Sequence, residues 1–266
     1  MNHSYIRFIL LCCFLLSTGP VIGGTTCLER TISPQALYDA SRLALQLRNV
    51  LDASGAQLAL VGRIGSDVSK YGIKYTHVGF VLRDHPKGRW LFVHVLNRCG
   101  TDSSAIYDEG LINFFTDDPY KLEAVVIIAS AQLQERLKRV ILSPLADRLH
   151  QPHYSVVAYP FADSYQNSNQ WLLEMIAAAQ AGEGKVNNRQ QAQDYLLSRG
   201  YEPGRIPIAA TERVGATLFR ANAHFLDHPL SERLQGQYQV VTAESVIRYL
   251  EKTDKGVTVK EIELKR

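Results

Sequence analysis

The hydrophobic positions along the chain follow helical spacing in some segments and strand-like spacing in others. After Ser33-Pro34, apolar residues recur every three or four positions, which predicts a helix over residues 34–53 that ends at Gly55. Helical spacing also appears over residues 132–149, 168–181, 189–199 and 243–252. Short β-rich runs predict strands over residues 57–63, 75–82, 89–96, 122–129, 154–159, 238–241 and 257–264. The pattern therefore predicts an α+β fold.

The runs over residues 75–82 and 89–96 are joined by a polar stretch from Asp84 to Gly88, which is typical of a β-hairpin. We expect a central antiparallel sheet with helices packed on it. No Gly-, Ser- or Pro-rich linker interrupts the pattern. We therefore predict one domain over residues 24–266, with a C-terminal extension after about residue 200.

The first 23 residues have the three-part pattern of a secretory signal peptide. Arg7 precedes an apolar run over residues 8–16, and Gly23 ends a small-residue cleavage site. That run is about half of the ~20 residues that a membrane-spanning helix needs, which favours cleavage over anchoring. We expect an exported protein, periplasmic or secreted, with no transmembrane span once the leader is removed.

Composition narrows the class of protein. The 266 residues are 46% hydrophobic and 21% charged, which excludes a disordered chain and a polytopic membrane protein. Twenty-nine Lys and Arg against 26 Asp and Glu give a net charge of +3, and the two signs are interspersed. This distribution predicts no nucleic-acid partner.

Of the four cysteines, Cys27 and Cys99 remain after removal of the leader. In an oxidising compartment an even pair indicates a disulfide between them. Cys99 lies close behind His94 in the sequence, so a nucleophilic thiol and a pair of free thiols are the alternatives.

Each strand of the expected hairpin carries a polar histidine in an apolar setting, His77 in the first and His94 in the second. If residues 84–87 form the turn, residue 83 lies opposite residue 88 and His77 lies opposite His94. The two imidazoles would then share one face of the sheet, ~5 Å apart at Cβ. The simple interpretation of either residue alone is a core histidine whose ring nitrogens are hydrogen-bonded. Two such residues in register indicate a functional site.

Several familiar motifs do not occur, among them a Gly-rich phosphate loop, a Gly-x-Ser-x-Gly elbow and a His-Glu-x-x-His zinc motif. The pairs His150/His153 and His224/His228 have no carboxylate at ligand spacing. We therefore expect no metal and no cofactor.

A polar run from Tyr159 to Gln170 opens onto the helix predicted to begin at Ser168. Side chains at a helix start lie against unpaired N–H groups and the positive end of the helix dipole, where an anion is stabilised. Nucleophiles are often placed there. The alternative is that Asn167 or Ser168 only caps the helix.

The His77 strand, the His94 strand and the Asn167-Ser168-Asn169 helix start together resemble the circularly permuted branch of the papain-like superfamily. That branch includes permuted NlpC-type amidases and lecithin:retinol acyltransferase-like proteins. Most of the chain after the leader also resembles an uncharacterised family of secreted bacterial proteins, domain of unknown function 2145. This second resemblance rests on residues 59–65, 75–79 and 166–174.

The papain-like resemblance implies a permuted papain-like fold and a role for each matching residue. His77 would be the general base, His94 would orient it, and Ser168 would take the nucleophile position, where the superfamily has Cys. Asn167, Asn169 and Arg63 would bind substrate.

A thiol is activated as a thiolate, whereas a serine must lose its proton to a base during attack. Two functions follow from the resemblance. The first is an exported hydrolase or acyltransferase acting on amide or ester bonds, with cell-wall peptide or lipid as substrate. The second is a non-catalytic binding module that uses the same groove for a peptide, lipid or protein ligand.

Overall fold

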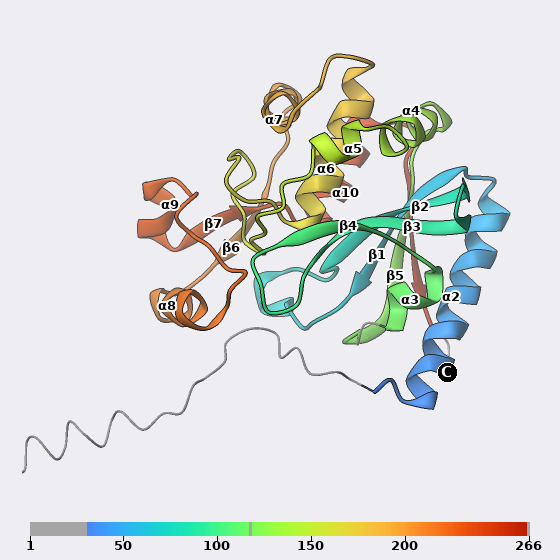
Figure 1. Ribbon diagram of the computed structural model, residues 1–266, viewed down its shortest axis with the longest axis horizontal. Helices are drawn as coiled ribbons and strands as arrows, with labels where there is room; N and C mark the ends of the chain where they lie inside the picture. The colour runs from blue at the N-terminus through green and yellow to red at the C-terminus, as the bar shows by residue number, and fades with distance from the viewer. Residues whose placement is uncertain (1–30, 117–118, 265–266) are drawn as a thin grey trace, which may run out of the picture.

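The computed structural model describes residues 31–116 and 119–264, and it has the predicted α+β architecture (Figure 1). Its strands are β1 (Leu58–Ile64), β2 (His77–His85), β3 (Gly88–Asn97), β4 (Ser104–Glu109), β5 (Lys121–Ile128), β6 (Gly204–Pro207), β7 (Gln237–Val240) and β8 (Thr258–Glu263). Its helices are α2 (Pro34–Ser54), α3 (Leu111–Thr116), α4 (Ala131–Ile141), α5 (Leu145–Arg148), α6 (Ser168–Ala181), α7 (Arg189–Ser198), α8 (Ala210–Phe219), α9 (Leu230–Gln235) and α10 (Ala243–Thr253). A short 3-10 turn covers Ser69–Tyr71.

Six strands form one antiparallel sheet in the order β4-β3-β2-β1-β5-β8. The predicted antiparallel sheet with helices packed on it is confirmed. Several elements differ from the prediction. Strands β4 and β6 and helices α3, α8 and α9 were not expected. The helix predicted over residues 132–149 is interrupted at Ser143-Pro144, since proline cannot continue the hydrogen-bond ladder.

The segment 154–159, predicted to be a strand, makes only an isolated bridge between Tyr154 and Gln166. The adjacent main chain is held by other partners: Val156 N–H donates to the carbonyl of Asn222, and Tyr159 N–H donates to the carboxylate of Asp227. These contacts across the fold override the β propensity of its Val and Tyr residues.

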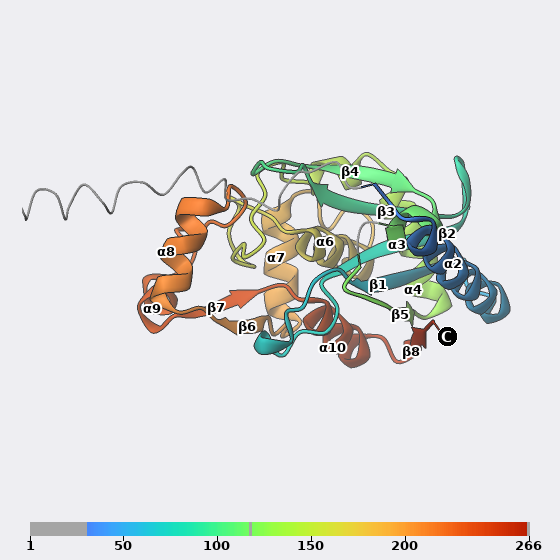
Figure 2. The same cartoon turned by 90° about the horizontal axis from the view of Figure 1, so that it is seen from below.

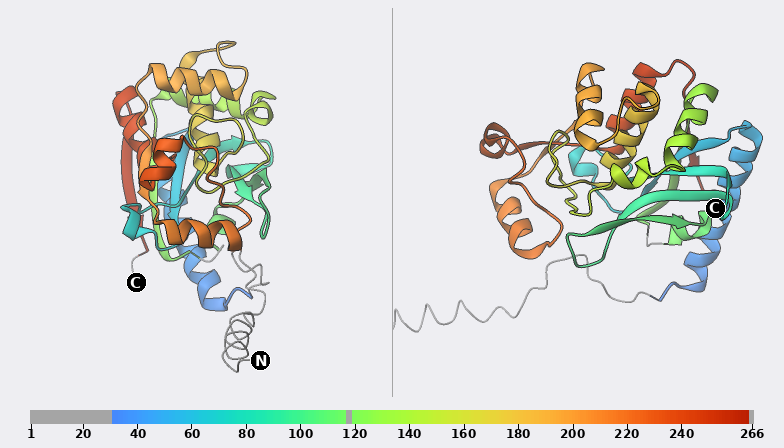
Figure 3. Two further views of the ribbon diagram at one scale, coloured as in Figure 1. Left: turned by 90° about the vertical axis from the view of Figure 1, so that its left-hand side faces the viewer. Right: turned by 45° about the horizontal axis from the view of Figure 1, so that its top comes forward.

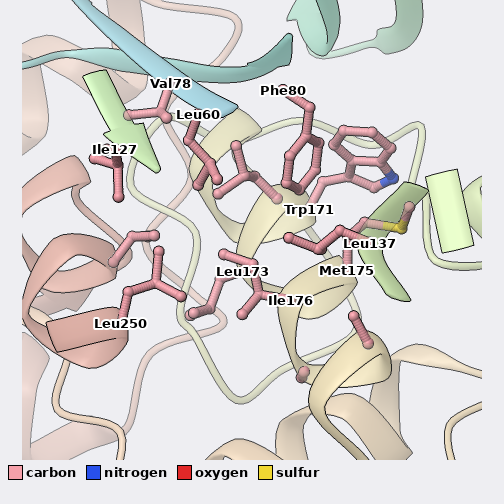
Figure 4. Packing of buried hydrophobic residues seen from close by; sticks show 14 of the residues in the cluster. Leu60, Val78, Phe80, Ile127, Leu137, Trp171, Leu173, Met175, Ile176 and Leu250 are labelled. Carbon is pink, nitrogen blue, oxygen red and sulfur yellow. The ribbon is translucent and has the colours of Figure 1, made fainter. Parts of the chain in front are cut away.

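Helices cover both faces of the six-stranded sheet (Figures 1 and 3). The larger core lies beneath α4, α6 and α10, where the Trp171 ring packs 5.9 Å from the ring of Phe80 (Figure 4). The other core lies beneath α2 and α3 and contains Trp90, Phe92 and Phe114. Because successive strand residues point to opposite faces, the buried side chains of β2 alternate between the two cores.

A small lobe over residues 204–240, called the C-terminal lobe below, lies beyond one end of the sheet (Figure 2). It contains the β6–β7 ribbon with α8 and α9, and it has a small core of its own around Phe225 and Tyr238. The chain then returns, because α10 joins the larger core and β8 pairs with β5. The region after residue 200 therefore completes the main sheet as well as forming the lobe.

The predicted signal peptide and Cys27 fall outside the described residues. Export, and the disulfide between Cys27 and Cys99, therefore stay predictions. In the part of the chain that the structure describes, no helix is long and apolar enough to cross a membrane.

Candidate functional site

The hairpin that carries the two histidines has a tighter turn than predicted. Asp84 pairs with Arg89 and His85 with Gly88, so only Pro86 and Lys87 lie in the loop. The register is therefore shifted by two residues from the prediction, and His94 lies beside Gly79 instead of opposite His77. Since side chains alternate with period two, a two-residue shift leaves both imidazoles on the same face.

The two imidazoles are in direct contact. His77 Nε2 lies 2.8 Å from His94 Nδ1, and the ring centroids are 5.0 Å apart. On the far side, His94 Nε2 lies 3.1 Å from the Glu109 Oε1 atom, at an angle outside hydrogen-bond geometry. Glu109 stands opposite Phe92 on β4, which places its carboxylate diagonally beside His94.

The Glu109 carboxylate carries no proton to donate, and its negative charge beside His94 favours the tautomer in which His94 carries its proton on Nε2 and accepts at Nδ1. In that tautomer His77 donates from Nε2, which leaves a lone pair on its Nδ1 atom. Among the described residues no group donates to that nitrogen.

His77 is held in its neutral form. Burial lowers its pKa well below the usual value, and the neighbouring His94 and the Arg63 guanidinium lower it further. A neutral imidazole with a free lone pair is what general-base chemistry requires.

An aromatic layer from α3 covers the pair. The Phe114 ring stacks on Phe92 at 3.9 Å and lies 5.8 Å from each imidazole. Arg63 donates to the Phe114 carbonyl at 2.5 Å, and its guanidinium lies over the Phe114 ring. Arg63 is thus buried beneath α3, and its substrate-binding role stays a prediction.

The start of α6 is fixed by two asparagines. Asn167 is the N-cap, and its side chain accepts from Gln170 N–H at 2.8 Å. The Asn169 side chain accepts from Val78 N–H at 3.1 Å and faces the Thr76 carbonyl at 3.5 Å. Asn169 therefore holds the main chain on both sides of His77. The two asparagines predicted to bind substrate both have structural hydrogen bonds.

Helix α6 packs on the sheet face opposite to His77. With His77 as the base for Ser168, we expect the apolar residues of α6 on the face that displays His77, but Trp171 packs on Phe80. Residues 77 and 80 are three apart on β2, so they point to opposite faces. No hydrogen bond joins Ser168 to His77, whose Nε2 atom contacts His94.

Ser168 and Tyr154 face a cleft of about 820 Å³ between the β1–β2 loop, the start of α6 and the C-terminal lobe. Its walls are largely apolar, with Val156, Ile208 and Phe219 among them, and Asn167, Asn169 and Thr76 lie near Ser168. His77, His94 and Arg63 do not line it. An exposed ion pair between Lys70 and Glu212, at 2.7 Å, links the β1–β2 loop to α8.

A second groove, of about 800 Å³, runs between α2 and β8 and contains none of the predicted site residues. Within residues 31–116 and 119–264 no three His, Cys, Asp or Glu side chains form a cluster that could hold a metal ion.

Two residues of the site were missed by the sequence analysis. Glu109 lies on β4, a strand that was not predicted. Its Ala-Ile-Tyr-Asp-Glu run is short and ends in two acidic residues, so it is a weak indication of a strand. Tyr154 lay within a segment interpreted as a strand. Nothing local in the sequence indicates that it lines the same cleft as Ser168.

Comparison with known proteins gives a family match. The model of a family described as "Uncharacterized protein conserved in bacteria (DUF2145)" matches residues 50–250. No curated protein and no solved structure matches the chain. The papain-like resemblance therefore remains an expectation.

Proposed function

Because the chain belongs to this uncharacterised bacterial family, its activity has to be inferred from the site, and we propose an exported hydrolase or acyltransferase acting on amide or ester bonds. One observation carries the proposal. In the tautomer that the Glu109 carboxylate favours, His77 keeps a lone pair on Nδ1, and no described residue donates to that nitrogen. An imidazole oriented by a polar partner is the usual arrangement of a general base.

Ser168 is the proposed nucleophile. It stands at the start of α6 in the cleft, next to the asparagine that holds the main chain around His77. Helix α6 packs on the sheet face opposite to His77, which is the first residue of β2. For this role the Ser168 hydroxyl would have to approach His77 around that end of the strand.

The reaction proceeds in two halves. Ser168 Oγ bonds to the carbonyl carbon while its proton passes to His77 Nδ1, and the carbonyl oxygen takes the negative charge. Collapse of this intermediate breaks the bond to the leaving amine or alcohol, which takes the proton from His77. Water, or an acceptor alcohol or amine, then repeats these steps on the acyl-enzyme and restores Ser168.

The cleft suggests the kind of substrate. Its apolar walls and its polar end near Ser168 suit a molecule with an apolar portion attached to an amide or ester. A lipid or a cell-wall peptide with apolar side chains fits this description.

A non-catalytic binding module is the second candidate, and the place of the histidine pair outside the cleft favours it. Ser168 lines the cleft, but His77 and His94 do not. In this case the cleft would bind its ligand with no need for the His77 lone pair.

A fluorophosphonate probe separates the two candidates without knowledge of the substrate, since it phosphonylates a serine that has a working base. We expect labelling of the mature protein at Ser168 that is absent in Ser168→Ala and reduced at least ~100-fold in His77→Gln. Ser164→Ala, which changes an exposed serine just before α6, is the matched control and should label normally. Absence of labelling in the wild-type protein, or equal labelling of Ser168→Ala, would contradict the enzyme and leave the binding module.

A further inference from the structure

The C-terminal lobe exposes large apolar side chains at its outer end. Helices α8 and α9 both lie at the end of the molecule opposite to α2 (Figures 1 and 2). Leu226 and Leu234 are 82% and 78% exposed, the two highest values among the large apolar side chains of the described residues. Single exposed leucines are normal on a protein surface, but a group of them on one lobe marks an interaction site. The exposed large apolar residues of the lobe are Val214, Leu218, Phe219, Leu226, Leu230 and Leu234.

Helix α8 has two apolar sides with different surroundings. Ala216 and Phe219 line the cleft that contains Ser168. Val214 and Leu218 are four residues apart, so they share a side of the helix, and the helical period turns that side away from the cleft. One side of α8 therefore lies on the cleft, and the other side is exposed.

Helix α9 continues the exposed surface. Leu230 and Leu234 are also four residues apart and lie opposite the buried Glu232. Arg213 on α8 donates to the Arg233 carbonyl of α9 at 2.6 Å, which holds the two helices together. The outward sides of α8 and α9, with the segment that joins them, form a surface called the apolar end below. Its residues are Val214, Leu218, Leu226, Leu230 and Leu234.

The acidic side chains of the lobe are all occupied. Residues 204–240 contain three of them, Glu212, Asp227 and Glu232. Glu212 pairs with Lys70 at 2.7 Å, Glu232 lies 2.9 Å from His228 Nδ1, and the Asp227 side chain is only 1% exposed. No carboxylate of the lobe is therefore left to give the apolar end a negative charge.

The free charges of the lobe are basic. Arg220 directly follows α8, and Arg205 is exposed on β6. Arg233 is half-buried and comes just before Leu234 in α9. No described acidic side chain forms an ion pair with any of these three arginines. The lobe thus combines exposed leucines with unneutralised positive charge.

A bilayer with anionic headgroups fits this combination. Leucine side chains enter the boundary between headgroups and acyl chains, and arginines bind the phosphates. A second copy of the chain fits less well. A two-fold contact would place the same surface on both sides, so arginines would face arginines with no carboxylate of the lobe to neutralise them.

We propose that the C-terminal lobe docks on the surface of an anionic lipid bilayer through the apolar end, with its arginines at the headgroups. The docked α8 would have one side on the lipid and the other on the cleft, so a lipid would reach the cleft without crossing water. Docking itself does not depend on the proposed function, because it needs neither Ser168 nor His77.

The first test is sedimentation of the mature protein with lipid vesicles. We expect binding to vesicles of phosphatidylglycerol and phosphatidylethanolamine, weaker binding in about 0.5 M NaCl, and little binding to phosphatidylcholine alone. Leu226→Ser and Leu234→Ser should each lower the partition coefficient by about tenfold, since each removes an inserted apolar side chain. Leu45→Ser, at an exposed leucine of α2, is the matched control and should bind as the wild-type protein does.

The second test places a reporter at the apolar end. Trp90 and Trp171 are 1% and 0% exposed, so the fluorescence of the wild-type protein should change little with vesicles. In Leu226→Trp, anionic vesicles should shift the emission to shorter wavelength, and brominated acyl chains should quench it. The same substitution at Leu45 should show neither change.

Three outcomes would overturn the proposal. One is no binding of the wild-type protein to anionic vesicles, and another is equal binding by the Leu226→Ser and Leu234→Ser variants. The third is a dimer in solution that Leu226→Ser dissociates, without vesicle binding, which would assign the surface to a second copy. Fluorophosphonate labelling in the absence of vesicles should be the same in Leu226→Ser and the wild-type protein, so failure of docking and failure of the proposed function are separate results.

Discussion

Two buried polar networks lie within the main domain, one around Glu174 and one around His77. The Glu174 carboxylate has donors on both oxygens: Gln166 at 2.6 Å and Arg189 at 3.0 Å on Oε2, and Arg189 at 3.1 Å and Gln193 at 3.2 Å on Oε1. In the His77 network, by contrast, His77 Nδ1 has no donor among the described residues, and the His94–Glu109 contact lacks hydrogen-bond geometry.

This difference indicates a structural role for the Glu174 network and makes the His77 network the candidate for proton transfer. A buried charge without partners costs several kcal/mol, so a carboxylate surrounded by donors fits a role in holding the fold. Arg189 also donates to the carbonyls of Ala162, Asp163 and Tyr165, which fixes the loop that leads to α6. A buried imidazole with an unused lone pair contributes less to stability and leaves an atom free to accept a proton.

The largest expected effect comes from breaking the complete network. Arg189→Met removes the charge and all five donors while keeping a long side chain, so the Glu174 carboxylate remains buried without a counter-charge. We expect a loss of about 3–5 kcal/mol in the free energy of unfolding. Urea unfolding at neutral pH measures it, with Arg199→Met at the exposed end of α7 as control. A loss below about 1 kcal/mol would show that the Glu174 network does not hold the fold.

A smaller effect, seen in activity, should follow from breaking the incomplete network. His94→Ala removes the acceptor for His77 Nε2, so His77 loses the contact that fixes its orientation and tautomer. We expect fluorophosphonate labelling to slow by roughly 100-fold. His94→Asn, whose side-chain oxygen can accept from His77, should restore part of the rate. Equal rates in His94→Ala and the wild-type protein would contradict an orienting role for His94.

The third effect is a pH dependence that belongs to His77. The unfolded chain takes up a proton on this residue near pH 6.5, but the folded protein does so only at lower pH, because burial lowers the pKa of His77. The unfolded state therefore binds more protons in this range, and stability falls as the pH drops below about 6.5, with a slope of at most about 1.4 kcal/mol per pH unit.

The His77→Gln variant should not lose stability in this way. The free energy of unfolding of the wild-type protein, relative to that of the variant, should therefore decrease between pH 7.5 and 5.5. Burial raises the pKa of Glu174, but that residue is present in both proteins and cancels in the comparison. Parallel pH profiles of the two proteins would show that His77 takes up its proton equally in both states.

The histidine pair could be predicted from the sequence because it depends on local alternation. His77 and His94 share a face whether the hairpin loop has four residues or two, so the error in register did not separate them. The packing of α6 could not be predicted in the same way. Its residues are buried almost all round, and the helix gives no narrow apolar stripe that selects one face of the sheet. Tyr154 and Glu109 reach the site through contacts between distant segments, for which the sequence has no short-range signal.

Gly79 has a consequence for finding related sites in other chains. A Cβ atom at this position would come within 3.0 Å of the Phe92 ring and 3.1 Å of the His94 Cβ atom, so a side chain here would push the second histidine away from the first. Its φ angle is not in the left-handed region, which means that the glycine provides space and not a turn. A search pattern for the same pair should therefore require His, any residue and Gly on one strand, then an aromatic residue and His at alternate positions on the next. The hairpin loop between them can vary in length by an even number of residues, so the spacing of the two histidines should be left free.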